Sequence, residues 1–207
     1  MEPSEVAALG RSVAATLRAA VVDCEPGTDC AAGAEAREAL ASRAELVKGT
    51  AAKVGVLVKA EGGLLGGGEA TEGALKVLEQ AAVGFAAGAA AAEAGAGRQL
   101  REALHSHARA MVEACASLAE GATDPAAQPA SSFNAAVGRV WDVCDKTQKL
   151  PRDNRAAVGR ALSRVGVAVK DVMRELAEMA EEAAEGKENG LLAELQAGGS
   201  GGGGDDD

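Results

Sequence analysis

The clearest helical pattern in the chain lies in residues 153–185, which read DNRAAVGRALSRVGVAVKDVMRELAEMAEEAAE. Its large apolar residues follow at steps of 4, 3, 4, 3, 4 and 3: Val158, Leu162, Val165, Val169, Val172, Leu176 and Met179. This spacing predicts one helix with an apolar seam over three heptads, capped by Asp153 or Asn154 and ending near Glu185. Such a seam can form a leucine-zipper homodimer, and a helix inside an intramolecular bundle shows the same pattern. We favour the bundle and keep the homodimer as the second interpretation.

Five further stretches carry apolar residues at helical spacing. They cover approximately residues 4–22, 34–60, 69–93, 97–120 and 131–149. Alanine, which is abundant throughout, favours helix, whereas aromatic residues, which strands prefer, make up only 1% of the chain. The patterns predict an all-α fold, an antiparallel up-and-down bundle of five to six helices spanning residues 1–185. Residues 186–207 lose the helical period and predict a Gly-rich acidic linker or tail.

The overall charge favours protein partners. The formal net charge is −10 and no basic cluster stands out, so we expect neither nucleic acid nor an anionic membrane as a partner. The first residues lack the basic start of a secretory signal, and the most apolar run, residues 81–92, is too short to span a bilayer. We therefore expect the nucleus and the cytoplasm, with reduced thiols. Cys24 and Cys30 flank a turn, and whether they ever pair stays open.

Residues suited to catalysis are few. The two histidines, His105 and His107, stand two positions apart on one predicted helix, so they point to different sides and cannot share a metal ion. Glu102 and His105 match half of a di-iron motif, but the second half is absent from the sequence. His107 falls on an apolar stripe, which predicts a hydrogen-bonded core histidine. We expect no catalytic, cofactor-binding or metal-binding residues, and no enzyme.

Two charged features flank the apolar seam. Four arginines precede or begin the seam: Arg152, Arg155, Arg160 and Arg164. Residues 171–188 carry seven acidic and two basic side chains. Either group could contact a partner of opposite charge, although a solvated helix face is the simpler interpretation. The partner-binding residues are therefore unknown at this stage.

Three ordered blocks resemble a known family. They are residues 137–144 (VGRVWDVC), 150–157 (LPRDNRAA) and 167–176 (VAVKDVMREL). A Val-Trp-x-x-Cys helix, a Pro-Arg-Asp-Asn connection and a helix with Val-Lys-Asp are similar to the GCIP-like family of cyclin-D-binding proteins, in its N-terminal domain. The last block is most similar to plant members. The resemblance covers about a fifth of the chain.

The resemblance implies a non-catalytic cell-cycle regulator that binds D-type cyclins and restrains cyclin-dependent kinase signalling. It also implies a helix-loop-helix element without a basic region, made here by the last two helices, and a bundle similar to those of talin and vinculin. An adhesion or cytoskeletal scaffold of the talin and vinculin type is the alternative function. Within the motif, we expect Trp141 to be a core anchor, because no other residue of that size exists in the chain.

Overall fold

The computed structural model describes the backbone of residues 3–20, 30–60, 69–123 and 130–198, and the side chains of residues 8–19, 31–60, 69–123 and 132–183. All regular structure in these ranges is helical. The six helices are α1 (Pro3–Ala20), α2 (Cys30–Ala60), α3 (Glu69–Ala92), α4 (Arg98–Thr123), α5 (Ala130–Thr147) and α6 (Asn154–Gly198). The all-α prediction is confirmed.

The chain forms two units, Met1–Val158 and Gly159–Asp207. The first unit is a bundle made of α1 to α5 together with the first turn of α6. The second unit has one helix, the remainder of α6, within its described residues. The predicted extent of the interaction domain, residues 1–185, stays a prediction.

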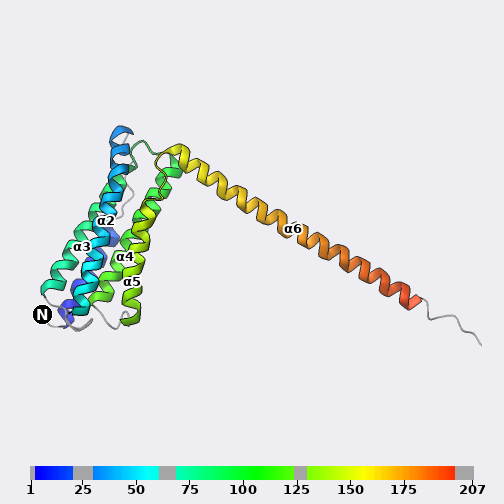
Figure 1. Ribbon diagram of the computed structural model, residues 1–207, viewed down its shortest axis with the longest axis horizontal. Coiled ribbons are helices and arrows are strands. Elements are labelled where there is room, and N and C mark those ends of the chain that lie inside the picture. Colours follow the sequence, from blue (N-terminus) through cyan, green and yellow to red (C-terminus); the bar gives the residue numbers. More distant parts are fainter. Residues whose placement is uncertain (1–2, 21–29, 61–68, 124–129, 199–207) are drawn as a thin grey trace, which may run out of the picture. The chain divides into compact units, whose positions relative to one another are not determined.

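Helices α2 to α5 form a closed four-helix arrangement, because each contacts the next and α5 returns to α2 (Figure 1). Cross-helix contacts show that α2 and α5 are antiparallel: Lys48 of α2 pairs with Asp145 of α5, while Gly55 lies beside Val137. Helix α1 packs against α4 and α3. It is antiparallel to α4, since Gly10 lies beside Thr123 and Arg18 pairs with Glu113. This is the up-and-down order that the spacing of apolar residues predicts.

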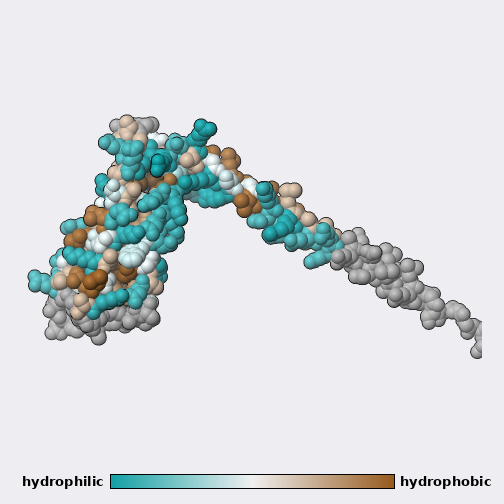
Figure 2. Space-filling model, viewed as in Figure 1, coloured by the Kyte–Doolittle hydropathy of each residue, from teal (hydrophilic) through white to brown (hydrophobic). Residues whose placement is uncertain are grey.

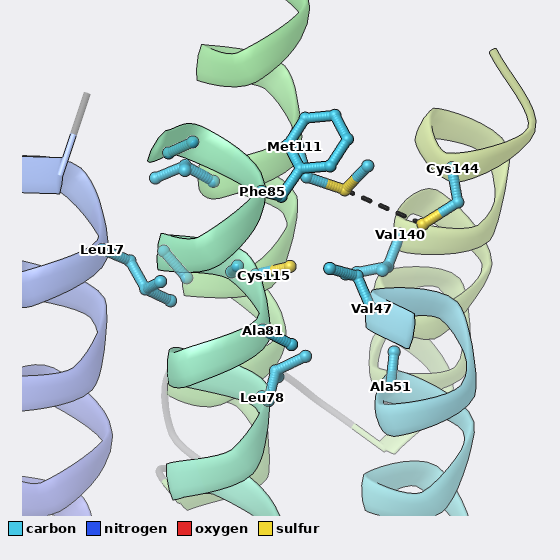
Figure 3. Packing of buried hydrophobic residues seen from close by; sticks show 14 of the residues in the cluster. Leu17, Val47, Ala51, Leu78, Ala81, Phe85, Met111, Cys115, Val140 and Cys144 are labelled. Atoms are coloured by element: carbon cyan, nitrogen blue, oxygen red, sulfur yellow. Dashed lines mark hydrogen bonds between the residues drawn. The ribbon is translucent and has the colours of Figure 1, made fainter. Parts of the chain in front are cut away.

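The core of the bundle is built from leucine, valine and alanine with very few aromatic side chains. Phe85 is fully buried near the middle, and Met111 and Cys144 approach each other beside it with a sulfur–sulfur distance of 3.7 Å (Figure 3). The largest fully buried side chains are Phe85, Leu17, Leu75, Leu78, Leu100, Leu104, Met111, Leu118, Val47, Val54, Val112 and Val140. Burying one such side chain contributes about 1.5–3 kcal/mol, so packing rather than intrinsic propensity stabilises these helices.

Two glycines allow helices to approach more closely than any other residue would. A Cβ atom on Gly10 would overlap the Thr123 side chain of α4, and one on Gly33 would overlap the Ala94 carbonyl after α3. By contrast, a Cβ atom on Gly73 would meet nothing within 4 Å. The first two glycines are therefore required by packing, and the third is not.

The turn between α3 and α4 is held by residues from distant parts of the chain. Gly95 has a φ of 67°, the left-handed conformation that glycine adopts without strain. Asn154 accepts a hydrogen bond from the Gly97 amide at 2.6 Å and donates one to the Gly95 carbonyl at 3.3 Å. Arg37 of α2 donates to the Ala92 carbonyl at 2.7 Å, which satisfies a carbonyl at the end of α3.

Helix α6 begins as predicted and ends later than predicted. Asp153 accepts a hydrogen bond from the Ala156 amide at 2.7 Å and is the N-cap. The helix then continues to Gly198 instead of stopping near Glu185. The prediction that a linker begins at residue 186 is therefore wrong for residues 186–198, whose leucine, glutamate and alanine residues are strong helix formers. Residues 199–207 lie outside the described part of the chain.

Candidate protein-interaction surface

The apolar seam of α6 is exposed to solvent. Every large side chain of this seam has between 46% and 67% of its surface exposed, and Figure 2 shows apolar atoms open along the described part of the helix. We use the name α6 seam for these residues: Val158, Leu162, Val165, Val169, Val172, Leu176 and Met179. The second unit holds no other described helix that could cover it, so the burial of this seam inside a bundle stays a prediction.

Small residues border the first half of the α6 seam. Gly159, Ala161, Gly166 and Ala168 occupy the positions immediately beside it, where two-stranded coiled coils usually carry charged side chains. In the second half the corresponding positions hold Met173, Glu175, Ala180 and Glu182, of which all but Ala180 are large or charged. The seam is therefore bordered by small residues in its first half and mostly by large or charged residues in its second half.

Charge is divided along the same helix. Residues 159–170 contain three basic side chains and no acidic one, whereas residues 171–183 contain five acidic side chains and one basic one. Arg174 forms exposed ion pairs with Asp171 at 3.6 Å and with Glu178 at 3.8 Å. Exposed pairs of this kind contribute little to stability.

Trp141 lies at the surface of α5 and is not the expected core anchor. Its side chain is 42% exposed. The core face of α5 is defined by Phe133, Val140 and Cys144, and one further residue turns the helix by about 100°. Trp141 therefore stands at the edge of the apolar stripe, and that part of the prediction is wrong.

The turn of α5 that follows Trp141 carries two ion pairs. Asp142 and Lys146 form an i,i+4 ion pair on α5, and Asp145 pairs with Lys48 across to α2. The hydrogen bond to Asp145 raises the pKa of Lys48. These pairs leave a large apolar ring exposed on a helix that also carries several charged groups, an arrangement typical of protein-contact surfaces.

The two histidines have separate structural roles. His107 Nε2 forms a hydrogen bond of 2.8 Å with the Thr147 hydroxyl, and its ring lies edge-on to Phe85 with centroids 5.9 Å apart. Burial, with a contribution from the charge of Lys146, lowers its pKa below 6.5. His105 instead faces the buried Glu93, at 3.9 Å. The hydrogen bond predicted for His107 is confirmed, whereas its ring is half-buried and not fully inside the core.

The two described thiols are buried and held in the neutral form. Burial raises the pKa of Cys144 to about 12 and raises that of Cys115 further. A neutral buried thiol is a poor nucleophile and packs as a small apolar group. Cys24 lies outside the described residues and the side chain of Cys30 is not described, so their pairing stays open.

Sequence patterns did not reveal the main polar contact between α1 and α4. Arg18 Nε and Nη2 donate to the two carboxylate oxygens of Glu113 at 3.1 and 3.0 Å, and Nη1 donates to Glu120 at 2.7 Å. These hydrogen bonds raise the pKa of Arg18 and lower that of Glu113. Arg18 is 95 positions from Glu113 and 102 positions from Glu120, and only the spacing of the two glutamates, seven residues apart on α4, indicated a shared cationic partner.

Metal-ligand clusters and membrane-spanning helices are both absent from the described ranges. In them, no three histidine, cysteine, aspartate or glutamate side chains come together as metal ligands would. No helix in the same ranges combines the length and the hydropathy needed to cross a membrane.

Comparison with known proteins identifies the family. The family model described as Grap2 and cyclin-D-interacting, N-terminal, matches residues 39–182, which run from α2 to the end of the described α6 seam. All three blocks of the sequence resemblance lie inside this match. No curated protein and no solved structure is similar enough to count as a match, so the likeness to plant members and to talin and vinculin bundles stays a prediction. The chain belongs to the Grap2 and cyclin-D-interacting protein family and carries its N-terminal domain.

Proposed function

We propose that this chain is a non-catalytic protein-interaction module that binds a D-type cyclin and thereby restrains cyclin-dependent kinase signalling, in the nucleus and the cytoplasm. The observation that carries the proposal is the family match over residues 39–182, because the family's description names cyclin D as the interacting protein. The acidic character of the chain, with a net charge of −10, supports a protein partner over a nucleic acid or an anionic membrane.

The described titratable groups support a non-catalytic role. His107 is neutral and engaged with Thr147, and the thiols of Cys115 and Cys144 are buried with raised pKa values. A general base or nucleophile must be reachable by substrate with its pKa near the working pH. These groups instead have the environment of core residues.

Trp141 is the best candidate for a cyclin contact on the bundle. Tryptophan is enriched among the residues that dominate binding energy at interfaces, because it buries a large area with little loss of conformational freedom. Here the only tryptophan of the chain is 42% exposed, although the bundle core takes up most other large apolar side chains. We propose that the cyclin covers this ring.

A pull-down with purified D-type cyclin tests both parts of the proposal. The wild-type chain and the Leu46→Ala variant should bind, since Leu46 is a similarly exposed apolar residue, 59% exposed, on α2. Trp141→Ala should weaken binding by about thirtyfold, a loss of about 2 kcal/mol for a central contact. Absence of binding by the wild type would contradict the cyclin assignment. Equal binding by both variants would contradict the contact assigned to Trp141.

A kinase assay and microscopy extend the test to the consequences. Added chain should lower the activity of a purified cyclin-D-dependent kinase, and the Trp141→Ala variant should do so less. A tagged chain should be found in both nucleus and cytoplasm. Unchanged kinase activity in the presence of bound chain would show that binding does not restrain the enzyme.

A scaffold of the talin and vinculin type is the second candidate, favoured by the antiparallel five-helix bundle itself. Co-sedimentation of the chain with an actin or other cytoskeletal fraction, run beside the cyclin pull-down, separates the two. Retention by the cytoskeletal fraction and not by cyclin would favour the scaffold.

A further inference from the structure

We propose that the α6 seam pairs with the α6 seam of a second copy of this chain, in antiparallel orientation. The proposal is independent of cyclin binding, which we place on the bundle. It starts from the exposure of seven large apolar side chains on one helical stripe. A contiguous apolar stripe of this kind marks an interaction site on a soluble protein, and a helix without tertiary packing is only marginally stable in water.

The heptad pattern defines which residues would meet. Val158, Val165, Val172 and Met179 occupy d positions, and Leu162, Val169, Leu176 and Ala183 occupy a positions. In an antiparallel pair each a residue lies opposite a d residue. One register then fills every layer with apolar groups from both copies. Its layers are Val158 with Ala183, Leu162 with Met179, Val165 with Leu176, and Val169 with Val172, followed by the same four in reverse.

Charge selects the antiparallel orientation. The basic segment, residues 159–170, would lie beside the acidic segment, residues 171–183, of the second copy. A parallel pair would instead place the two acidic segments side by side, and like charges at an interface oppose association. In the antiparallel register, Arg164 falls between Glu175 and Glu182 of the second copy. The alanines at positions 161 and 168 leave room for the arginine to reach them.

Side-chain size agrees with the same orientation. Three of the four small residues beside the first half of the seam would face a larger residue beside the second half. The antiparallel register sets Gly159 opposite Ala180, Ala161 opposite Glu182, Gly166 opposite Met173, and Ala168 opposite Glu175. Each large flanking group therefore meets a small one, so the helices can approach without crowding.

The exposed valines of α6 supply a matched pair of variants. Val169 lies in the central layer and is 52% exposed, while Val167 lies off the seam and is 59% exposed. Light scattering coupled to size-exclusion chromatography should find the 207-residue chain dimeric at tens of micromolar. Val169→Glu should be monomeric at the same concentration and Val167→Glu should remain dimeric. Circular dichroism of each variant checks that the helices are retained.

Cysteine cross-linking tests the orientation. A mixture of Leu162→Cys and Met179→Cys chains should give a disulfide between positions 162 and 179 of different copies, identified by mass spectrometry. Leu162→Cys alone should give little 162–162 disulfide. The proposal would be overturned if the wild type were monomeric, if Val169→Glu left the dimer intact, or if Val167→Glu also dissociated it. Predominant 162–162 cross-links would overturn the antiparallel arrangement.

Cyclin binding separates a failure of this proposal from a failure of the proposed function. Because Val169→Glu leaves the bundle surface unchanged, this variant should still bind cyclin.

Discussion

The bundle of α1 to α5 and the seam of α6 are built from the same apolar residue types, but the bundle buries these side chains and the seam exposes them. Leu78, Val47 and Val140 are fully buried between helices of the bundle, whereas Leu162, Val165 and Val169 on α6 are more than half exposed. Helical periodicity fixes which residues share a face and does not fix what covers that face. A stable core and an interaction surface can therefore have the same sequence pattern, and they differ in the helices that lie next to them.

The largest expected difference in the free energy of unfolding is between truncating a bundle side chain and truncating an α6 side chain. Phe85→Ala should lower the free energy of unfolding by about 3–5 kcal/mol, because it leaves a cavity among fully buried residues. Val167→Ala, off the seam on α6, should change it by less than about 0.5 kcal/mol. Urea unfolding followed by circular dichroism measures both. A loss under about 1 kcal/mol for Phe85→Ala would contradict the description of the core.

A smaller contrast separates glycines inside the bundle. Gly10→Ala should destabilise the chain by about 1–3 kcal/mol, because the new Cβ atom overlaps Thr123 and forces α1 away from α4. The matched change Gly73→Ala should stabilise it by up to about 1 kcal/mol, since the methyl group meets nothing and alanine is the better helix former. Thermal unfolding measures the change in melting temperature that each variant causes. A change in melting temperature of the same sign for both variants would show that α1 does not pack against α4 as described.

The contact of Arg18 with two glutamates should contribute less than the apolar packing. Arg18→Ala should cost about 1 kcal/mol, at the upper end for an exposed pair because the geometry is bidentate and shared. Lys76→Ala, which removes an exposed i,i+4 pair with Glu72 inside α3, should destabilise the chain less than Arg18→Ala does. High salt should narrow the difference between wild type and Arg18→Ala, and a difference independent of salt would point to lost packing instead.

The smallest expected effect is a pH dependence from His107. Its folded-state pKa is lowered by burial, so protons bind to the unfolded chain first as pH falls below about 6.5. The contribution of neutral His107 to the free energy of unfolding is therefore complete above pH 6.5. It is lost as pH falls toward the lowered folded-state pKa. Urea unfolding at pH 7.5 and pH 5.5 should show a larger decrease for wild type than for His107→Gln. Equal decreases would indicate that the ring is protonated as easily in the folded chain as in water.

Local regularities made most of the fold predictable. Six helices follow from periodic Leu and Val among helix-favouring alanines, and Asp153 was recognisable as a cap before an apolar stripe. The later end of α6 was missed because residues 186–198 lack an apolar period, although their intrinsic helix propensity is high. The role of Asn154 at the turn after α3 depends on residues 57 and 59 positions away, which no local pattern contains.

The candidate surface was only partly predictable. The heptad spacing located the α6 seam correctly, but a bundle helix and a helix that pairs with another chain share that spacing. Trp141 was misplaced because size suggested burial, whereas its angular position on α5 sets it at the edge of the core stripe. Exposure depends on the arrangement of neighbouring helices, which the sequence of one helix does not contain.

Amide hydrogen exchange at two protein concentrations tests the difference between bundle and seam most directly. Peptides from the bundle, such as those covering residues 74–89, should exchange slowly and equally at both concentrations, because their own chain covers them. Peptides covering residues 159–183 should exchange rapidly at submicromolar concentration and become protected at tens of micromolar, as second copies cover the seam. Protection of residues 159–183 that is as strong as that of the bundle and unaffected by concentration would contradict the account.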